Sequence, residues 1–136
     1  MNDLVMNDLV DKLNRLDEVG YYRLGCPVDD LKAAVQANEY AMFDVQLKGI
    51  KGKVNVLNEI ARAIKFPAEF GSNWDAMADS LCDVSWQPAK GYVMALHDAR
   101  TNFGLSANDN EILQDIFTDT VQYWKQRNKV FWIFNA

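Results

Sequence analysis

Hydrophobic and polar positions alternate with two different periods along this chain, and each period predicts one type of element. In residues 41–49, AMFDVQLKG, every second residue from Phe43 to Leu47 is apolar, which predicts a β-strand with one buried face. Two nearly continuous apolar runs, GYVMALHD at 91–98 and KVFWIFN at 129–135, have the length of strands that are covered on both faces. The chain therefore contains three predicted strands.

Helical spacing of apolar residues fills the segments before and between these strands. Apolar positions three and four residues apart predict helices, and capping residues, glycines and prolines mark their ends. The predicted helices are residues 6–19, ended by Gly20; 27–38, with Asp29 or Asp30 near the cap; 54–66, ended by Pro67; 72–83; and 108–127, where Asn108 and Glu111 have the spacing of a capping box.

The order strand, helix, short helix, strand, helix, strand is typical of right-handed crossovers around a small parallel sheet. We therefore expect an α/β fold with a three-stranded parallel sheet and packed helices at residues 41–136. An N-terminal helical extension should occupy residues 1–40, and it begins with the pentamer MNDLV written twice. The sequence leaves three roles open for this extension: covering the sheet, contacting a partner, or forming a dimer.

Composition and charge narrow the class of partner. Of the 136 residues, 49% are hydrophobic and 24% charged, as in an ordinary globular protein, and the net charge is −5. A surface that binds phosphates must be basic, so we expect no direct contact with nucleic acid or with an anionic membrane, and a basic protein is favoured. The apolar runs are too short to span a bilayer, and the acidic N-terminus lacks the pattern of a secretion signal. The pattern of the two cysteines, Cys26 and Cys82, indicates reduced thiols. We therefore expect a cytoplasmic protein.

The helix predicted at residues 72–83, SNWDAMADSLCD, carries two stripes of opposite character. Residues three, four and seven positions apart lie on one side of a helix, and residues four and eight positions apart lie on another. The apolar stripe consists of Trp74, Met77, Ala78 and Leu81, and the acidic stripe consists of Asp75, Asp79 and Asp83. One side of the helix is thus suited to burial and its neighbour to negative charge.

The acidic stripe opposes the stability of its own helix. Like charges four residues apart cost about 0.2–0.5 kcal/mol per pair, and carboxylates beyond the first turn oppose the helix dipole. Asp75 has a local explanation, because Ser72 and Asp75 have the spacing of a capping box. No lysine or arginine occurs between Lys65 and Lys90. A solvated face is one explanation, and insertion into a basic cleft of a partner is the other.

The segment FPAEFGSNWDAMADSLCD, residues 66–83, resembles the signature of the barstar family of intracellular inhibitors of secreted ribonucleases. That signature has a proline, an aromatic residue, Gly-x-Asn-x-Asp-Ala and a further aspartate, and the resemblance extends more weakly over the rest of residues 41–136. It implies a barstar-like fold and a mechanism in which the acidic helix blocks the active site of a nuclease, with carboxylates in the place of RNA phosphates. Asp75 and Asp79 match the principal acidic contacts, and Asp79 matches the anchor.

The resemblance implies a wider partner-binding set as well. It places Glu69, Phe70, Gly71 and Asn73 in the binding loop and at the start of the helix, with Asp83 at its end, and it matches Asp119 to a glutamate on the following long helix. Two positions depart from the family. Ala78 stands where the family has a contact tryptophan, and Glu69 stands where it has a tyrosine. These departures suggest a different nuclease or a different basic toxin.

Two other functions compete with ribonuclease inhibition. The same fold could serve as an immunity or adaptor protein for a toxin that is not a ribonuclease. An enzyme would use Asp75 and Asp79 as a general acid and base, but a pair on an exposed ridge is poorly placed to enclose a substrate. His97 is the only histidine, no nucleophile stands near it in the sequence, and no cysteine–histidine set has zinc spacing. We therefore expect a structural histidine, no metal, no cofactor and no enzymatic activity.

Overall fold

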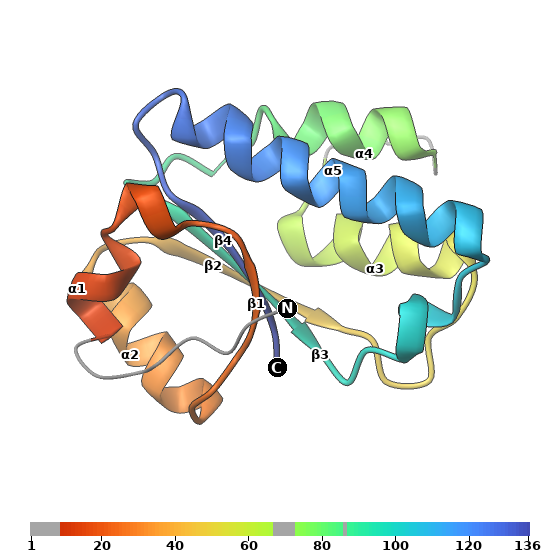
Figure 1. Cartoon of the computed structure of the whole chain (residues 1–136), viewed down its shortest axis with the longest axis horizontal. Coiled ribbons are helices and arrows are strands. Elements are labelled where there is room, and N and C mark those ends of the chain that lie inside the picture. The colour runs from red at the N-terminus through yellow and green to blue at the C-terminus, as the bar shows by residue number, and fades with distance from the viewer. Residues whose placement is uncertain (1–8, 67–72, 86) are drawn as a thin grey trace.

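The computed structural model describes residues 9–66, 73–85 and 87–136. Helices and strands alternate along these residues, and Figure 1 shows a central sheet with helices on both sides. In chain order the elements are α1 (Leu9–Leu13), the 3₁₀ turn η1 (Leu16–Glu18), β1 (Tyr21–Arg23), α2 (Val28–Ala37), β2 (Ala41–Gln46), α3 (Lys53–Ile64), α4 (Trp74–Leu81), β3 (Tyr92–His97), the 3₁₀ turn η2 (Thr101–Gly104), α5 (Ala107–Lys125) and β4 (Phe131–Asn135).

The sheet is parallel throughout and has four strands in the order β1-β4-β3-β2. Strands β2, β3 and β4 lie where the sequence predicts them, but the predicted number of three strands is wrong. The fourth strand, β1, comes from the segment expected to be only helical, and it pairs with β4 so that Tyr21 lies opposite Ile133. Its three residues are too few to show the alternation by which a strand is recognised in a sequence.

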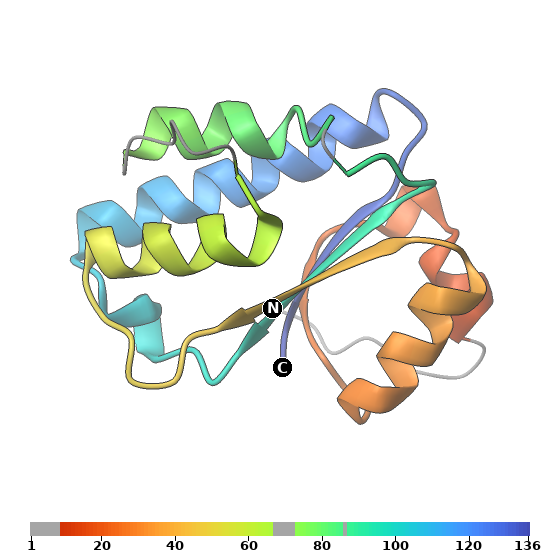
Figure 2. The same ribbon diagram turned by 180° about the vertical axis from the view of Figure 1, so that it is seen from behind.

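Each face of the sheet carries its own hydrophobic core. Helices α3, α4 and α5 cover one face, and α1 and α2 cover the other, as Figures 1 and 2 show from opposite sides. Phe43 and Val45 of β2 belong to the core under α3–α5, whereas Val93 of β3 and Trp132 of β4 belong to the core under α1 and α2. Because β3 and β4 lie between two helical layers, their sequences are apolar at nearly every position.

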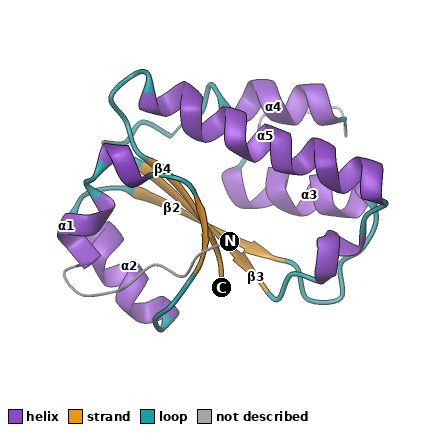
Figure 3. Cartoon of the chain, viewed as in Figure 1, coloured by secondary structure: helices purple, strands orange, loops and turns teal. Residues whose placement is uncertain are grey.

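The first two helices seal the second face of the sheet. Leu13 of α1 and Leu31 of α2 are fully buried against it. The indole of Trp132, in the centre of the sheet, donates a hydrogen bond from Nε1 to the carbonyl oxygen of Leu13 at 2.8 Å. The sequence left three roles open for the extension, and the structure shows one of them: the extension covers the sheet. Figure 3 shows the two groups of helices on either side of the strands.

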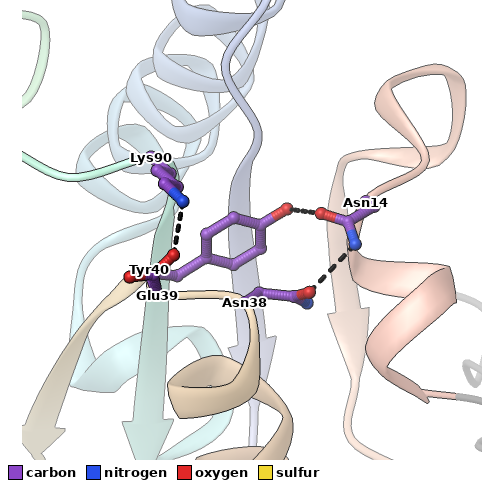
Figure 4. Close-up of polar contacts among 5 residues, drawn as sticks. All are labelled: Asn14, Asn38, Glu39, Tyr40 and Lys90. Carbon is purple, nitrogen blue, oxygen red and sulfur yellow. Dashed lines mark hydrogen bonds and ion pairs between the residues drawn. The ribbon is translucent and has the colours of Figure 1, made fainter.

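The N-terminal helical pattern is split into two pieces rather than continuous. The sequence predicts one helix over residues 6–19, but α1 ends at Leu13 and only a 3₁₀ turn follows. Asn14 occupies the break, and its side chain is used in long-range contacts. Its amide donates to Asn38 Oδ1 at 2.9 Å, and its own oxygen accepts a hydrogen bond from the Tyr40 hydroxyl (Figure 4). These bonds hold α1 to the turn between α2 and β2.

The residue that ends α3 and the residue that caps α5 can both be compared with the prediction, and the cap of α5 differs from it. Helix α3 ends at Ile64, where Lys65 adopts a left-handed conformation with φ 60°; Pro67, the predicted stop, lies outside the described residues. At the start of α5, the hydroxyl of Ser106 accepts a hydrogen bond from the backbone N–H of Asp109 at 3.1 Å. The predicted cap at Asn108 is therefore wrong, because Ser106 takes that role one half-turn earlier.

Within the described part of the chain, no helix has the length and apolarity that crossing a bilayer requires.

Candidate protein-binding site on helix α4

Helix α4 covers Trp74–Leu81, inside the predicted range of 72–83, and its cap is Asn73 rather than Ser72, the residue of the predicted capping box. The side chain of Asn73 accepts a hydrogen bond from the backbone N–H of Ala76 at 2.7 Å, which caps the helix. Trp74, Met77 and Leu81 are buried, as the predicted apolar stripe requires, and Ala78 is partly buried beside them. Because its side-chain oxygen accepts this hydrogen bond, Asn73 fixes where α4 begins.

Two indoles attach α4 to α5. Trp74 Nε1 donates to Asp109 Oδ1 at 3.3 Å near the start of both helices, and Trp124 Nε1 donates to the carbonyl oxygen of Leu81 at 2.9 Å near the end of α4. Helix α4 packs mainly on α3 and α5 and forms the outer part of this layer (Figure 1). The side of α4 that faces away from the core is thus held rigidly at the surface.

That outward side carries the acidic stripe. Asp75 and Asp79 are exposed on α4, and Asp83 is exposed in the turn that follows, because α4 ends at Leu81 rather than at the predicted residue 83. Among the described residues, none of the three forms an ion pair. No ion pair among the described residues thus neutralises these three carboxylates, and a basic partner would find them accessible.

Cys82 marks the place where α4 and α5 bring carboxylates together. Burial raises the pKa of the Cys82 thiol; the positive charge of Arg127 opposes this shift, and the negative charges of Asp119 and Asp79 add to it. Asp79 lies on α4 and Asp119 on α5, so the two residues are 40 positions apart in the chain and close to the same sulfur. Two of the residues that the resemblance nominated thus lie within electrostatic reach of one thiol.

Sequence reasoning missed a second acidic stripe, on α5. Glu111, Asp115 and Asp119 recur at intervals of four and are all exposed. The signal was the same as on α4, because no lysine or arginine occurs between Arg100 and Lys125. Only Asp119 was nominated, through the resemblance, and the acidic surface of the molecule is accordingly wider than predicted. We call the exposed residues of both stripes, Asp75, Asp79, Asp83, Glu111, Asp115 and Asp119, the acidic surface.

A cation borders this surface at the end of α5. The guanidinium of Arg127 lies 3.5 Å from the centre of the Tyr123 ring and donates a hydrogen bond to the carbonyl oxygen of Tyr123 at 2.9 Å. Stacking on the ring holds the side chain in place. Arg127 is therefore a fixed positive charge near Cys82. It would repel the basic groups of a partner that approached this end of the acidic surface.

Three of the nominated residues, Glu69, Phe70 and Gly71, lie outside the described residues.

His97 has a structural partner: its Nε2 lies 2.7 Å from Asp44 Oδ1, across the adjacent strands β3 and β2. This contact ties the last residue of β3 to the edge strand β2.

The comparison with protein-family models decides the family. The model described as "Barstar (barnase inhibitor)" matches residues 40–136, which is well over half of the chain. The chain belongs to the barstar family. Members of this family are inhibitors rather than enzymes, and they bind ribonucleases. A comparison with curated proteins returned no match.

The matched region has clear boundaries in the structure. It starts at Tyr40, immediately before β2, and contains three of the four strands together with α3, α4 and α5. Helices α1 and α2 and the edge strand β1 precede it. The helices that cover the second face of the sheet therefore lie outside the part of the chain that the family model describes.

Proposed function

We propose that this barstar-family protein inhibits a basic ribonuclease by inserting α4 and the loop before it into the active site of the enzyme. The observation that carries the proposal is the exposed stripe of Asp75, Asp79 and Asp83, which has no ion-pair partner among the described residues. The stripe lies within residues 40–136, which match the family of ribonuclease inhibitors.

The physical basis of the inhibition is charge complementarity. An enzyme that cleaves RNA needs a basic cleft for phosphates, and carboxylates on a rigid helix occupy the same positions. The stripe is unfavourable for the isolated protein because like charges stand one turn apart. A helix that keeps them is suited to a partner that supplies the opposite charge. The same negative charge disfavours direct binding of nucleic acid or of an anionic membrane.

Within the stripe, Asp79 is the proposed anchor. It stands in the middle of α4, and Asp119 of the neighbouring helix lies close to the same thiol. A cation of the partner that approaches this point would meet two carboxylates from different helices. Asp75, Asp83 and the loop residues Glu69, Phe70 and Gly71 would surround this contact, and the protein would act stoichiometrically, without a cofactor, in the cytoplasm of the cell that makes the nuclease.

A second function is favoured by one departure from the family. Ala78 lies between Asp75 and Asp79, where the family has a contact tryptophan, and it leaves a flatter surface than an indole would. The partner can therefore be a basic toxin that is not a ribonuclease, with the protein as its immunity or adaptor protein. The fold and the acidic surface would be used in the same way.

The test uses a panel of basic ribonucleases that includes barnase, with RNA cleavage measured as the protein is titrated. We expect stoichiometric inhibition of at least one enzyme. In that complex Asp79→Asn should weaken binding about 30-fold or more, the lower end of the cost of removing one partner of a buried charge pair. Asp29→Asn, an exposed carboxylate on α2, is the matched control and should leave the affinity unchanged. Equal affinity of Asp79→Asn and the unmodified protein would exclude Asp79 as the anchor, and absence of inhibition across the panel would favour the non-ribonuclease toxin.

A further inference from the structure

A polar cavity opens at the carboxyl ends of strands β3 and β4, on the other side of α5 from α4. It has a volume of about 490 Å³ and lies between Asn135 at the end of β4, the η2 turn after β3, and the first turns of α5. In parallel α/β sheets this edge is where ligands bind, because the loops after the strands diverge there. The volume is within the range of small-molecule sites.

The lining of the cavity is rich in hydrogen-bond donors and contains no carboxylate. Arg100, Thr101 and Gln114 line it, and among the described residues none of these three side chains has a hydrogen-bond or ion-pair partner. In a chain of net charge −5, a cavity with an arginine and no aspartate or glutamate in its wall differs from the rest of the surface. An anionic ligand is the occupant that this lining suits.

Amide side chains form a second part of the wall. Asn110 Nδ2 donates to Asn102 Oδ1 at 3.3 Å, while Asn110 Oδ1 is buried and has no hydrogen-bond partner among the described residues. A buried amide oxygen without a partner is unfavourable, and its burial leaves Nδ2 as the donor of Asn110 on this side chain. Asn135 also lines the cavity and is hydrogen-bonded to Tyr21. Amides offer both donors and acceptors, which is what the edges of a nucleobase require.

Lys51, in the loop after β2, comes close to the η2 turn beside the cavity. The side chains of Lys51 and Arg100 flank Gly104: a Cβ added at Gly104 would lie 2.6 Å from Lys51 Cβ and 3.5 Å from Arg100 Cδ. Gly104 has φ +63°, and its carbonyl accepts a hydrogen bond from the backbone N–H of Gly52 at 3.2 Å. The glycine thus lets the loop after β2 approach the η2 turn, and the backbone of Lys51 lies near the side chain of Arg100.

We propose that this cavity binds a mononucleotide, with Arg100 at the phosphate and the amides of Asn110 and Gln114 at the base. The half-buried ring of Tyr21, which also lines the cavity, offers a surface for the base. A free nucleotide fits better than a nucleic acid polymer, because the exposed carboxylates of α5 adjoin the cavity and repel a chain of phosphates. The cavity borders the α5 part of the acidic surface but shares no residue with it, and the proposal does not depend on the proposed inhibition.

The experiment titrates the full-length protein with 5′-AMP, GMP, CMP and UMP, and separately with inorganic phosphate and a short RNA oligonucleotide, by calorimetry and by thermal unfolding. At least one mononucleotide should bind and raise the melting temperature in a concentration-dependent way. Arg100→Gln should weaken that binding at least 10-fold, and Arg100→Lys should retain part of it. Arg62→Gln, which changes an exposed arginine on α3, is the matched control and should bind as the unmodified protein does.

Three results would overturn the proposal. They are the absence of any mononucleotide binding at millimolar concentration, equal binding by Arg100→Gln and Arg62→Gln, and binding of phosphate or of the oligonucleotide alone with the same affinity as the best mononucleotide. Unchanged melting temperatures of the unliganded variants show that a loss of binding is not a loss of folding.

Discussion

Asp79 of α4 and Asp119 of α5 both raise the pKa of the Cys82 thiol, so carboxylates from two helices lie within electrostatic reach of one sulfur. Each belongs to a stripe of acidic residues at intervals of four, and α4 and α5 are joined by the hydrogen bonds of Trp74 and Trp124. The two stripes therefore form one acidic surface of fixed geometry. A rigid arrangement of charges favours binding because little conformational entropy is lost when the partner arrives.

The free energy of unfolding should increase when Asp79 becomes asparagine. The change removes the repulsion with Asp75, one turn earlier in α4, and reduces that with Asp83 in the turn after the helix, so it should stabilise the protein by about 0.2–1 kcal/mol. Asp75→Asn is the comparison, because Asp75 lies in the first turn, where a negative charge interacts favourably with the helix dipole, and its change should have a smaller effect. Urea denaturation measures both. A clear loss of stability in Asp79→Asn would mean that this carboxylate has a partner within the protein.

The pKa of Cys82 reports the position of the two carboxylates without any partner protein. In a Cys26→Ser background, Asp79→Asn and Asp119→Asn should each lower the pKa of the Cys82 thiol, because each removes a negative charge that disfavours the thiolate. Arg127→Gln should raise it. The pH dependence of the rate of thiol modification gives the pKa.

The control for this titration is Asp115→Asn. Asp115 is an exposed carboxylate on α5 that does not contribute to the shift at Cys82, so its change should leave the thiol pKa where it is. An identical response to Asp115→Asn and Asp119→Asn would contradict the meeting of Asp79 and Asp119 at this sulfur.

The N-terminal helices should unfold together with the rest of the protein. Leu31 of α2 is fully buried against the second face of the sheet, and Leu31→Ala should destabilise the whole chain by about 2–5 kcal/mol. Val10→Ala, on an exposed position of α1, should change the stability by no more than about 0.5 kcal/mol. Urea unfolding followed by fluorescence and by circular dichroism measures both variants. A separate early transition confined to the helices would contradict a shared core.

Tyr21 should make stability depend on pH under alkaline conditions. Burial raises the pKa of Tyr21 from 10.0 to about 12, and its hydrogen bond with Asn135 opposes part of the shift. The folded protein therefore holds this proton more tightly than the unfolded chain does, so the contribution is complete below about pH 10 and is lost as the pH rises toward about 12. Tyr21→Phe should show a shallower loss of stability over this range in denaturation at fixed pH. If the stability of both proteins fell equally with pH over this range, the raised pKa of Tyr21 would be contradicted.

Local patterns in the sequence predicted most elements correctly, and they failed where the information was not local. The runs that became β3 and β4 are apolar at nearly every position, and this reflects two covering layers that act on each residue of the strand. Strand β1 has only three residues, and it is a strand because Tyr21 meets Ile133 of β4, more than a hundred positions away. Helix α5 is capped by Ser106 rather than by Asn108, because serine and asparagine are both good capping residues and the local sequence does not decide between them.

By itself the sequence determined the family, the parallel α/β architecture and the two stripes of α4, because the spacing of residues on one helix decides which side is apolar and which is charged. Only the tertiary structure decided that α1 and α2 cover the second face of the sheet and that Asp79 and Asp119 approach the same thiol. Helical periodicity extends over a few residues, whereas the distance between two helices depends on how their buried faces pack, and for α4 and α5 that packing rests on Trp74 and Trp124.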